Sequence, residues 1–130
     1  MDEAVIKRVP PHSIEAEQSV IGSMMMDRDA IMTAGEIISG SDFYQTVYGV
    51  LFDAMTELFN EGRPVDLVTL QERLKEKNVP PEISSMEYIR ELLEAVPTSA
   101  NVKYYAEIVQ EKSVLRRLIK MNEEIADSCY

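Results

Sequence analysis

The chain has 130 residues, of which 45% are hydrophobic, so it can bury one core without disulfides or bound metals. Its single cysteine, Cys129, cannot form an internal disulfide, and no apolar run is long enough to cross a membrane, which together predict a soluble cytoplasmic protein. Residues 1–100 carry 18 acidic and 8 basic side chains and hold the whole net charge of −10, whereas residues 101–130 carry 5 of each. Because strong nucleic-acid binding usually needs a basic surface, we expect no direct contact with DNA or RNA.

The first two predicted helices lie between the Pro10-Pro11 pair and the Ser39-Gly40-Ser41 stretch. Ser13 can cap the first helix, because its side-chain oxygen can accept a hydrogen bond from a free N–H of the first turn. Asp27 can cap the second helix in the same way. Apolar residues at three- and four-residue spacing are expected to face the core, and here they are Ile14, Val20, Ile21, Met24, Ile31, Met32, Ile37 and Ile38.

The third predicted helix runs from about Asp42 to Asn60 and supplies most of the aromatic core. Its apolar residues recur at helical spacing, and Gly62 and Pro64 are expected to end it. The aromatic side chains that we place in the core are Phe43, Tyr44, Phe52 and Phe59.

Two shorter helices are predicted next. Asp66 stands where the first of them needs an N-cap, and Asn78 with Pro80-Pro81 is expected to end it. Ser84 followed by Glu87 fits a capping box at the start of the second. The expected inward residues are Leu67, Leu70, Leu74, Tyr88, Ile89, Leu92 and Leu93. No stretch alternates as a β-strand does, so these helices predict an all-α head.

The last predicted helix, from about Ala100 to Ser128, is too long for that head. About 28 residues without Gly or Pro make a rod about 40 Å long, whereas a head of 100 residues has a radius of gyration of about 13 Å. The apolar residues beyond reach of the head are Val114, Leu115, Leu118, Ile119, Met121 and Ile125. Leaving them in water would forgo several kcal/mol, so we predict that another helix covers them, from a longer chain or from a second copy. The alternative is a break near Ser113 that folds the helix back.

No motif for catalysis, cofactors or metals is present. The chain lacks a phosphate loop, a GxGxxG turn, a CxxC pair and an HExxH helix, and its single His and single Cys cannot build a zinc site. His12 is expected to be a solvated loop residue. The basic cluster of Arg116-Arg117 with Lys120 is interpreted as a solvated helix face, with pairing to an acidic partner surface as the alternative.

Four segments, in this order along the chain, resemble segments of a known protein family. They read VPPHSIEAEQSVIGSMMMD, DFYQTVYGVLFDAM, GRPVDLVTLQERL and VPTSANVKYYAEIVQEKSVLRRLI. Together they resemble the N-terminal domain of the DnaB family of replicative DNA helicases, from about Pro10 to Tyr130. The chain departs from the family pattern at Tyr48-Gly49, where His-Arg or His-Gln is common, and at Ser84-Ser85, where a Gly-Gly pair is usual.

The resemblance implies a parent protein that forms a hexameric ring and unwinds DNA at replication forks. ATP and Mg²⁺ would then belong to a separate RecA-like C-terminal domain, and this chain would need no cofactor and would not itself be an enzyme. Domains of this family form a collar of three dimers and bind the C-terminal domain of the DnaG-type primase. Other helicase subunits and a helicase loader are the further partners that the resemblance allows, and no membrane is involved.

By this resemblance the fold class is all-α, a compact bundle of about five helices plus a long protruding C-terminal helix that is the first half of a helical hairpin. We expect a flexible N-terminal arm (1–12), a globular helical head (13–98) and the long helix, the first arm of a truncated hairpin (99–130). Glu15, Tyr88, Ile119 and Ile125 match positions that the family uses for primase contact or hairpin packing. Periodicity adds Leu115 and Leu118 as partner-binding residues. Ile119 and Ile125 as plain hairpin core, and Tyr88 buried in the head, are the alternatives.

Two other classes of function fit part of the pattern. An independent all-α dimerisation or adaptor module would show the same apolar stripe but would be complete at Tyr130, so the native stop codon would separate the two. A helix-turn-helix DNA-binding protein would need a basic recognition helix, and the acidic head argues against it.

Overall fold

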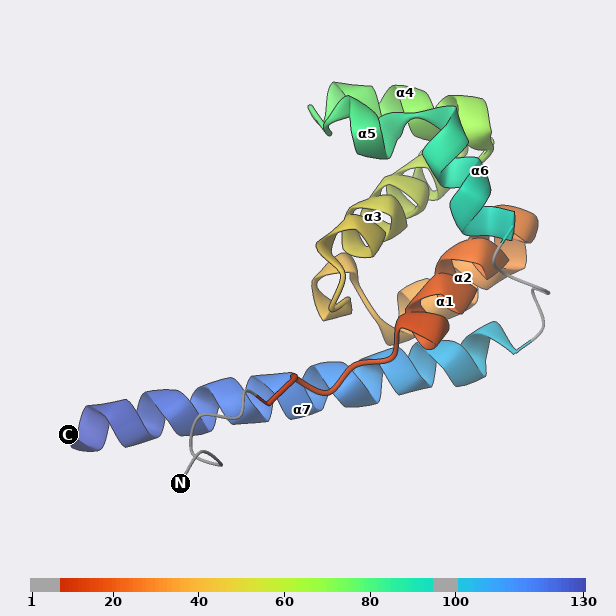
Figure 1. Ribbon diagram of the computed structural model, residues 1–130. Coiled ribbons are helices and arrows are strands. Elements are labelled where there is room, and N and C mark those ends of the chain that lie inside the picture. Colours follow the sequence, from red (N-terminus) through yellow and green to blue (C-terminus); the bar gives the residue numbers. More distant parts are fainter. Residues whose placement is uncertain (1–7, 95–100) are drawn as a thin grey trace.

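The computed structural model describes residues 8–94 and 101–130, which form an all-α head with one long helix protruding from it (Figure 1). The elements are α1 (Ile14–Met26), α2 (Arg28–Ile37), the 3₁₀ turn η2 (Gly40–Asp42), α3 (Thr46–Asn60), α4 (Leu67–Glu76), α5 (Pro81–Ser84), α6 (Met86–Glu94) and α7 (Val102–Cys129). The predicted fold class is therefore confirmed. The expected break at residues 96–99, the boundary at 98 and 99, and residues 1–7 of the arm lie outside the described residues.

Three predicted N-caps are confirmed. They were predictable because each capping oxygen and the N–H group that it binds lie only two or three residues apart. Ser13 Oγ accepts a hydrogen bond from the Ala16 N–H at 3.2 Å. Asp27 Oδ1 accepts from the Asp29 N–H at 2.9 Å, and Asp66 Oδ1 accepts from the Thr69 N–H at 2.9 Å. These side chains satisfy N–H groups that have no partner inside their own helix.

The expected start of the third helix at Asp42 is wrong. Residues 40–42 form the turn η2, and α3 begins only at Thr46. The two residues before it are held from α1, because the Glu17 carboxylate accepts hydrogen bonds from the N–H groups of Tyr44 at 2.8 Å and Gln45 at 3.1 Å. A contact with a residue 27 positions away along the chain leaves no signal in the local sequence.

The predicted capping box of Ser84 and Glu87 is also wrong. Pro81 opens the four-residue helix α5, a position that suits proline because the first helical N–H needs no intrahelical partner. Ser84 ends α5 and is buried, and Ser85 caps the next helix instead, since its Oγ accepts from the Tyr88 N–H at 3.1 Å. The expected helix at this place is therefore two helices, α5 and α6.

The core lies where α1, α2, α3, α4 and α6 meet. Its largest fully buried side chains are Phe52, Ile21, Met24, Ile31, Leu51, Met55, Leu58, Leu70, Leu74, Ile89, Glu17 and Val20. Two expected core residues are exposed instead, namely Met32 on α2 and Tyr44 in the loop before α3. The N-terminal half of α7 packs on α1 and α2, where Ala106 and Val109 are buried. The head therefore holds α7 by one end.

Candidate protein-interaction surface

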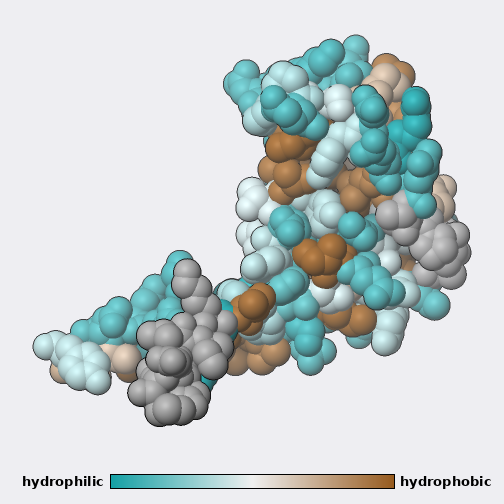
Figure 2. Space-filling model, in the orientation of Figure 1, coloured by the Kyte–Doolittle hydropathy of each residue, from teal (hydrophilic) through white to brown (hydrophobic). Residues whose placement is uncertain are grey.

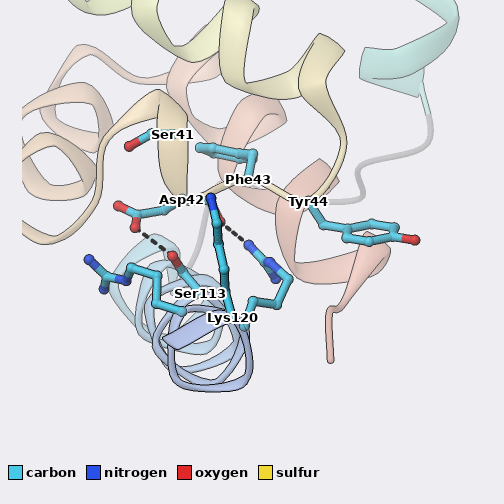
Figure 3. Close-up of a pocket in the computed structure, with 8 residues that line it drawn as sticks. Ser41, Asp42, Phe43, Tyr44, Ser113 and Lys120 are labelled. Carbon is cyan, nitrogen blue, oxygen red and sulfur yellow. Dashed lines mark hydrogen bonds between the residues drawn. The ribbon is translucent and has the colours of Figure 1, made fainter. Parts of the chain in front are cut away.

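The point where α7 leaves the head is fixed by polar contacts to η2. The Ser113 hydroxyl donates a hydrogen bond to Asp42 Oδ1 at 2.7 Å (Figure 3). The other Asp42 carboxylate oxygen accepts a hydrogen bond from the Ser39 N–H at 2.8 Å. Ser113 is buried, and α7 continues through it as one helix to Cys129. The alternative of a break near Ser113 is therefore wrong.

Arg116 ties three segments together, although the sequence suggested a solvated helix face. Its guanidinium donates to the carbonyl oxygens of Pro11 at 2.8 Å and Asp42 at 2.6 Å, and it lies 5.7 Å from the centre of the Tyr44 ring. The His12 ring stacks on the same tyrosine at 4.0 Å, so His12 lies in a loop, as expected, but is only partly exposed there. These contacts position the arm, η2 and α7 relative to one another.

The described part of the arm lies beside the protruding half of α7. Arg8, Val9 and Pro10 line one hollow of about 240 Å³ together with Ile119 and Glu123. A second hollow, of about 310 Å³, opens on the other side of Arg116 and is lined by η2, by Phe43 and Tyr44, and by Arg117 and Lys120 of α7. One flank of α7 is thus bordered by segments of this chain.

Beyond Ser113, the apolar side chains of α7 are uncovered. The six residues are between 38% and 60% exposed, and they are Val114, Leu115, Leu118, Ile119, Met121 and Ile125. Apolar atoms are visible at the lower edge of α7 in the space-filling view (Figure 2). Adjacent apolar side chains gathered on one protruding helix are typical of an interaction site, whereas isolated exposed apolar residues are common on any surface.

The six side chains form two seams along α7, because successive residues are rotated by about 100° in an α-helix. The heptad seam consists of Val114, Leu118, Met121 and Ile125. The arm-side seam consists of Leu115 and Ile119, and Ile119 lies against the arm. Ile119 and Ile125 are six residues apart and therefore lie about 120° apart around the helix axis. A single partner helix cannot cover both residues equally.

The two predicted partner-binding residues of the head lie apart from these seams. Glu15 is exposed in the first turn of α1. Tyr88 is half-buried on α6 and packs against the core, and this burial, with the nearby Tyr48, raises the pKa of its hydroxyl. The structure thus gathers Leu115, Leu118, Ile119 and Ile125 on one helix and leaves Glu15 and Tyr88 on the head.

Sequence reasoning missed the polar contacts at the base of α7. Asp42 and Ser113 are 71 residues apart, and the Arg116 contact to Pro11 spans 105 residues. The one available signal is that Ser113 lies on the same helical face as Ala106 and Val109. Within residues 8–94 and 101–130, no three His, Cys, Asp or Glu side chains gather as metal ligands would. In those same ranges, no helix has the length and apolar character to span a membrane.

Known proteins share the sequence pattern and the fold of this chain. A family model described as the DnaB-like helicase N terminal domain matches residues 9–111. The replicative DNA helicase DnaB of Geobacillus stearothermophilus is 47% identical over 130 residues, and the replicative DNA helicase DnaC of Bacillus subtilis (strain 168) is 39% identical over 130 residues. Both alignments cover 100% of this chain, which spans 29% of the length of each relative.

Two solved structures share the fold. The N-terminal domain of DnaB helicase from Mycobacterium tuberculosis is 37% identical with a TM-score of 0.86, and the alignment covers 92% of this chain and 85% of that one. The N-terminal domain of DnaB helicase from Helicobacter pylori, described together with its interactions with primase, is 20% identical with a TM-score of 0.76, with 88% and 89% covered. The second likeness concerns the fold alone.

Proposed function

The chain belongs to the family of DnaB-like helicase N-terminal domains, and we propose that it is the non-catalytic assembly and primase-docking domain of a hexameric replicative DNA helicase. The observation that carries this proposal is the uncovered apolar stretch of α7, held in a fixed direction by the contacts of Ser113 and Arg116 to η2. A rigid rod with apolar seams is suited to joining subunits into a collar of dimers and to receiving a partner.

We infer that the partners are other helicase subunits, the C-terminal domain of a primase and a helicase loader, all in the cytoplasm. The proposed contact residues are Glu15, Tyr88, Leu115, Leu118, Ile119 and Ile125. The structure from Helicobacter pylori, which is described with its interactions with primase, supports the choice of primase. A primase domain that bridges neighbouring subunits would bind one arrangement of the ring more tightly than others and so shift the population toward it.

The proposal assigns no catalytic step to this chain. ATP and Mg²⁺ would act in another part of the helicase, and the 130 residues contain no GxxxxGK[ST] phosphate loop. Titration of this chain with ATP in a calorimeter should therefore show no binding heat, and a gel-shift assay with DNA should show no salt-dependent affinity. Measurable binding of either ligand would contradict this part of the proposal.

Titration with the C-terminal domain of a primase tests the docking role. We expect Ile119→Ser and Tyr88→Ala each to weaken binding by at least about tenfold, because a buried apolar side chain contributes about 1.5–3 kcal/mol. Val68→Ser is the matched control, since Val68 is 57% exposed on α4, outside the proposed contacts. Equal affinity of all three variants and the unchanged chain would reject the docking role.

A further inference from the structure

The described part of the arm adds apolar surface to α7 instead of covering it. Residues 8–10 run along the protruding half of α7 beside Ile119 (Figure 1). Val9 and Ile119 line the same hollow, yet Val9 is 68% exposed and Ile119 is 45% exposed. A segment that shielded Ile119 from water would bury its own apolar side chain in the contact, because burial of apolar surface is favourable. The arm therefore widens the apolar surface that the arm-side seam offers.

Two hollows meet at this place, one of about 240 Å³ and one of about 400 Å³. The side chains that line both hollows are Pro10, Ile119 and Glu123. The other lining residues are Arg8 and Val9 for the smaller hollow, and Arg116 and Lys120 for the larger. Hollows of this size are at the small end of ligand pockets, so they suit single side chains of a partner protein.

The arm is held in position before any partner arrives. The Pro10-Pro11 pair has fixed φ angles, and Val9 precedes a proline, which restricts it to extended backbone. Arg116 donates a hydrogen bond to the Pro11 carbonyl oxygen at 2.8 Å, and the His12 ring stacks on Tyr44 at 4.0 Å. A segment that is already ordered loses less conformational entropy on binding than a free one. These contacts therefore favour the arm as part of a binding surface.

The charge around the two hollows indicates the chemistry of the partner. Three basic side chains and one acidic side chain line them, in a chain whose net charge is −10. The hydrogen bonds of Arg116 go to the carbonyl oxygens of Pro11 and Asp42, which carry no charge that could neutralise it. Lys120 forms no ion pair within residues 8–94 and 101–130. A complementary partner segment is therefore acidic.

We propose that residues 8–10 and the arm-side seam form one docking surface for an acidic segment of a partner protein, which places an apolar side chain in each hollow. Val9 and Pro10 are then contact residues. Arg116 and His12 are positioning residues that hold the arm against α7. The inference rests on the proposed function, under which the acidic segment belongs to the primase C-terminal domain.

Substitution of Val9 tests whether the arm takes part in docking. Val9→Ser should weaken binding of the primase C-terminal domain in calorimetry by at least about fivefold, because it removes an apolar side chain that the complex buries. Val68→Ser is the matched control, since Val68 is also an exposed valine, 57% exposed on α4, and should leave affinity unchanged. If Ile119→Ser weakens binding but Val9→Ser does not, the role of the arm is wrong and the docking role stands. If the unchanged chain does not bind primase, both fail.

Charge substitutions of opposite sign test whether the partner segment is acidic. Lys120→Gln should weaken primase binding by about two- to fivefold, and Glu123→Gln should strengthen it by a similar factor, as is usual for partly exposed ion pairs. Both effects should shrink at high salt. Lys103→Gln and Glu107→Gln make the same changes at exposed positions of α7 outside the hollows, so they should leave affinity unchanged. Effects of equal sign for Lys120→Gln and Glu123→Gln overturn the acidic partner.

Substitution of His12 tests the positioning of the arm. His12→Ala should weaken primase binding by about threefold, because a loosened arm must be ordered again on binding. His12→Phe keeps an aromatic ring that can stack on Tyr44 and should restore most of the affinity. Both variants should unfold at the denaturant midpoint of the unchanged chain. Equal affinity of His12→Ala and the unchanged chain overturns the positioning role, as does a failure of His12→Phe to restore binding.

Discussion

Glu17 is a carboxylate buried where α1 meets the start of α3. It is 1% exposed, and both its oxygens accept backbone hydrogen bonds, from Tyr44 at 2.8 Å and Gln45 at 3.1 Å. A negative charge at a helix N-terminus is favoured by the helix dipole and by the free N–H groups there. One side chain thereby fixes the direction in which α3 leaves the loop after η2.

We predict that Glu17→Ala lowers the free energy of unfolding by about 2–4 kcal/mol, because it removes the acceptor of two part-buried hydrogen bonds and empties a buried site. Glu17→Gln should cost less, since the amide keeps one acceptor oxygen. Denaturant unfolding at neutral pH measures both losses. Glu15→Gln, a change at an exposed position of the same turn, is the control and should stay within about 0.5 kcal/mol. An equally small effect of Glu17→Ala would show that water replaces the cap.

Gly49 allows α3 to approach η2 closely. A Cβ atom at Gly49 would lie 2.3 Å from the Gly40 carbonyl oxygen, which is backbone and cannot move aside easily. Gly49→Ala should therefore destabilise the fold by about 1–3 kcal/mol, the usual cost of overpacking. Gly35→Ala on α2 is the matched control, because no atom lies within 4 Å of the added methyl group. It should be neutral or stabilising by up to about 1 kcal/mol. Thermal unfolding of both variants tests the contrast.

Among single residues, side-chain contacts between near neighbours in the sequence were predictable, and contacts between distant residues were not. Ser13, Asp27 and Asp66 cap helices through atoms two or three residues away, and the sequence identified all three. Glu17 and Arg116 act on segments that only the folded chain brings near, so neither role was visible. The departure at Tyr48-Gly49 from the family pattern acquires a reason only once η2 is seen to lie against Gly49.

Among the elements, α3 and α4 are joined by a cluster of charges centred on Arg73. Its guanidinium donates to Glu61 at 2.7 Å and to Glu57 at 3.1 Å, and Lys77 also contacts Glu57. The hydrogen bond from Lys77 lowers the pKa of Glu57, with Arg73 adding to the effect, and the hydrogen bond from Arg73 lowers the pKa of Glu61. The partners in turn raise the pKa of Arg73. The cluster therefore stabilises the packing of α4 on α3 while the carboxylates are charged.

The lowered pKa values of Glu57 and Glu61 determine how the stability of the fold changes with pH. Because both carboxyl groups have a pKa below the ordinary value of 4.5 when folded, their contribution is present above about pH 4.5 and is lost as the pH falls through the lower folded value. Arg73→Met should thus lower the denaturant midpoint at pH 7. The difference in midpoint between this variant and the unchanged chain should disappear as the pH is lowered. Lys75→Met, at an exposed position of the same helix, should leave the midpoint unchanged at either pH. A gap that is constant with pH would mean that Arg73 acts by packing alone.

The element that the sequence predicted best is also the one that carries the candidate site. The sequence predicted a continuous helix from about Ala100 to Ser128 with uncovered apolar side chains, and α7 (Val102–Cys129) is continuous and exposes those side chains. The division into two seams follows from the same spacing, but its meaning depends on where residues 8–12 lie. That position is set by Arg116 and by the stacking of His12 on Tyr44, which are contacts between distant parts of the chain.

For the whole molecule, the first half of α7 belongs to the fold, and the proposed interactions belong to its second half. The last residue of α7 that is buried is Ser113, and the last that hydrogen-bonds to the head is Arg116. A chain ending at residue 116 should therefore unfold with a free energy within about 1 kcal/mol of the full chain, since only exposed residues are removed. It should show less helix by circular dichroism and should lose both self-association and primase binding.

A still shorter chain should lose the part of α7 that the fold needs. Ending at residue 105 removes Ala106, Val109 and Ser113, the residues of α7 that are buried against the head. Removing two buried apolar side chains and the anchor to Asp42 exceeds the margin by which small domains are stable, so this chain should not fold cooperatively. Cooperative unfolding of the chain ending at 105, or a loss of several kcal/mol in the chain ending at 116, would show that the boundary between the folding half and the interacting half of α7 does not lie near Ser113.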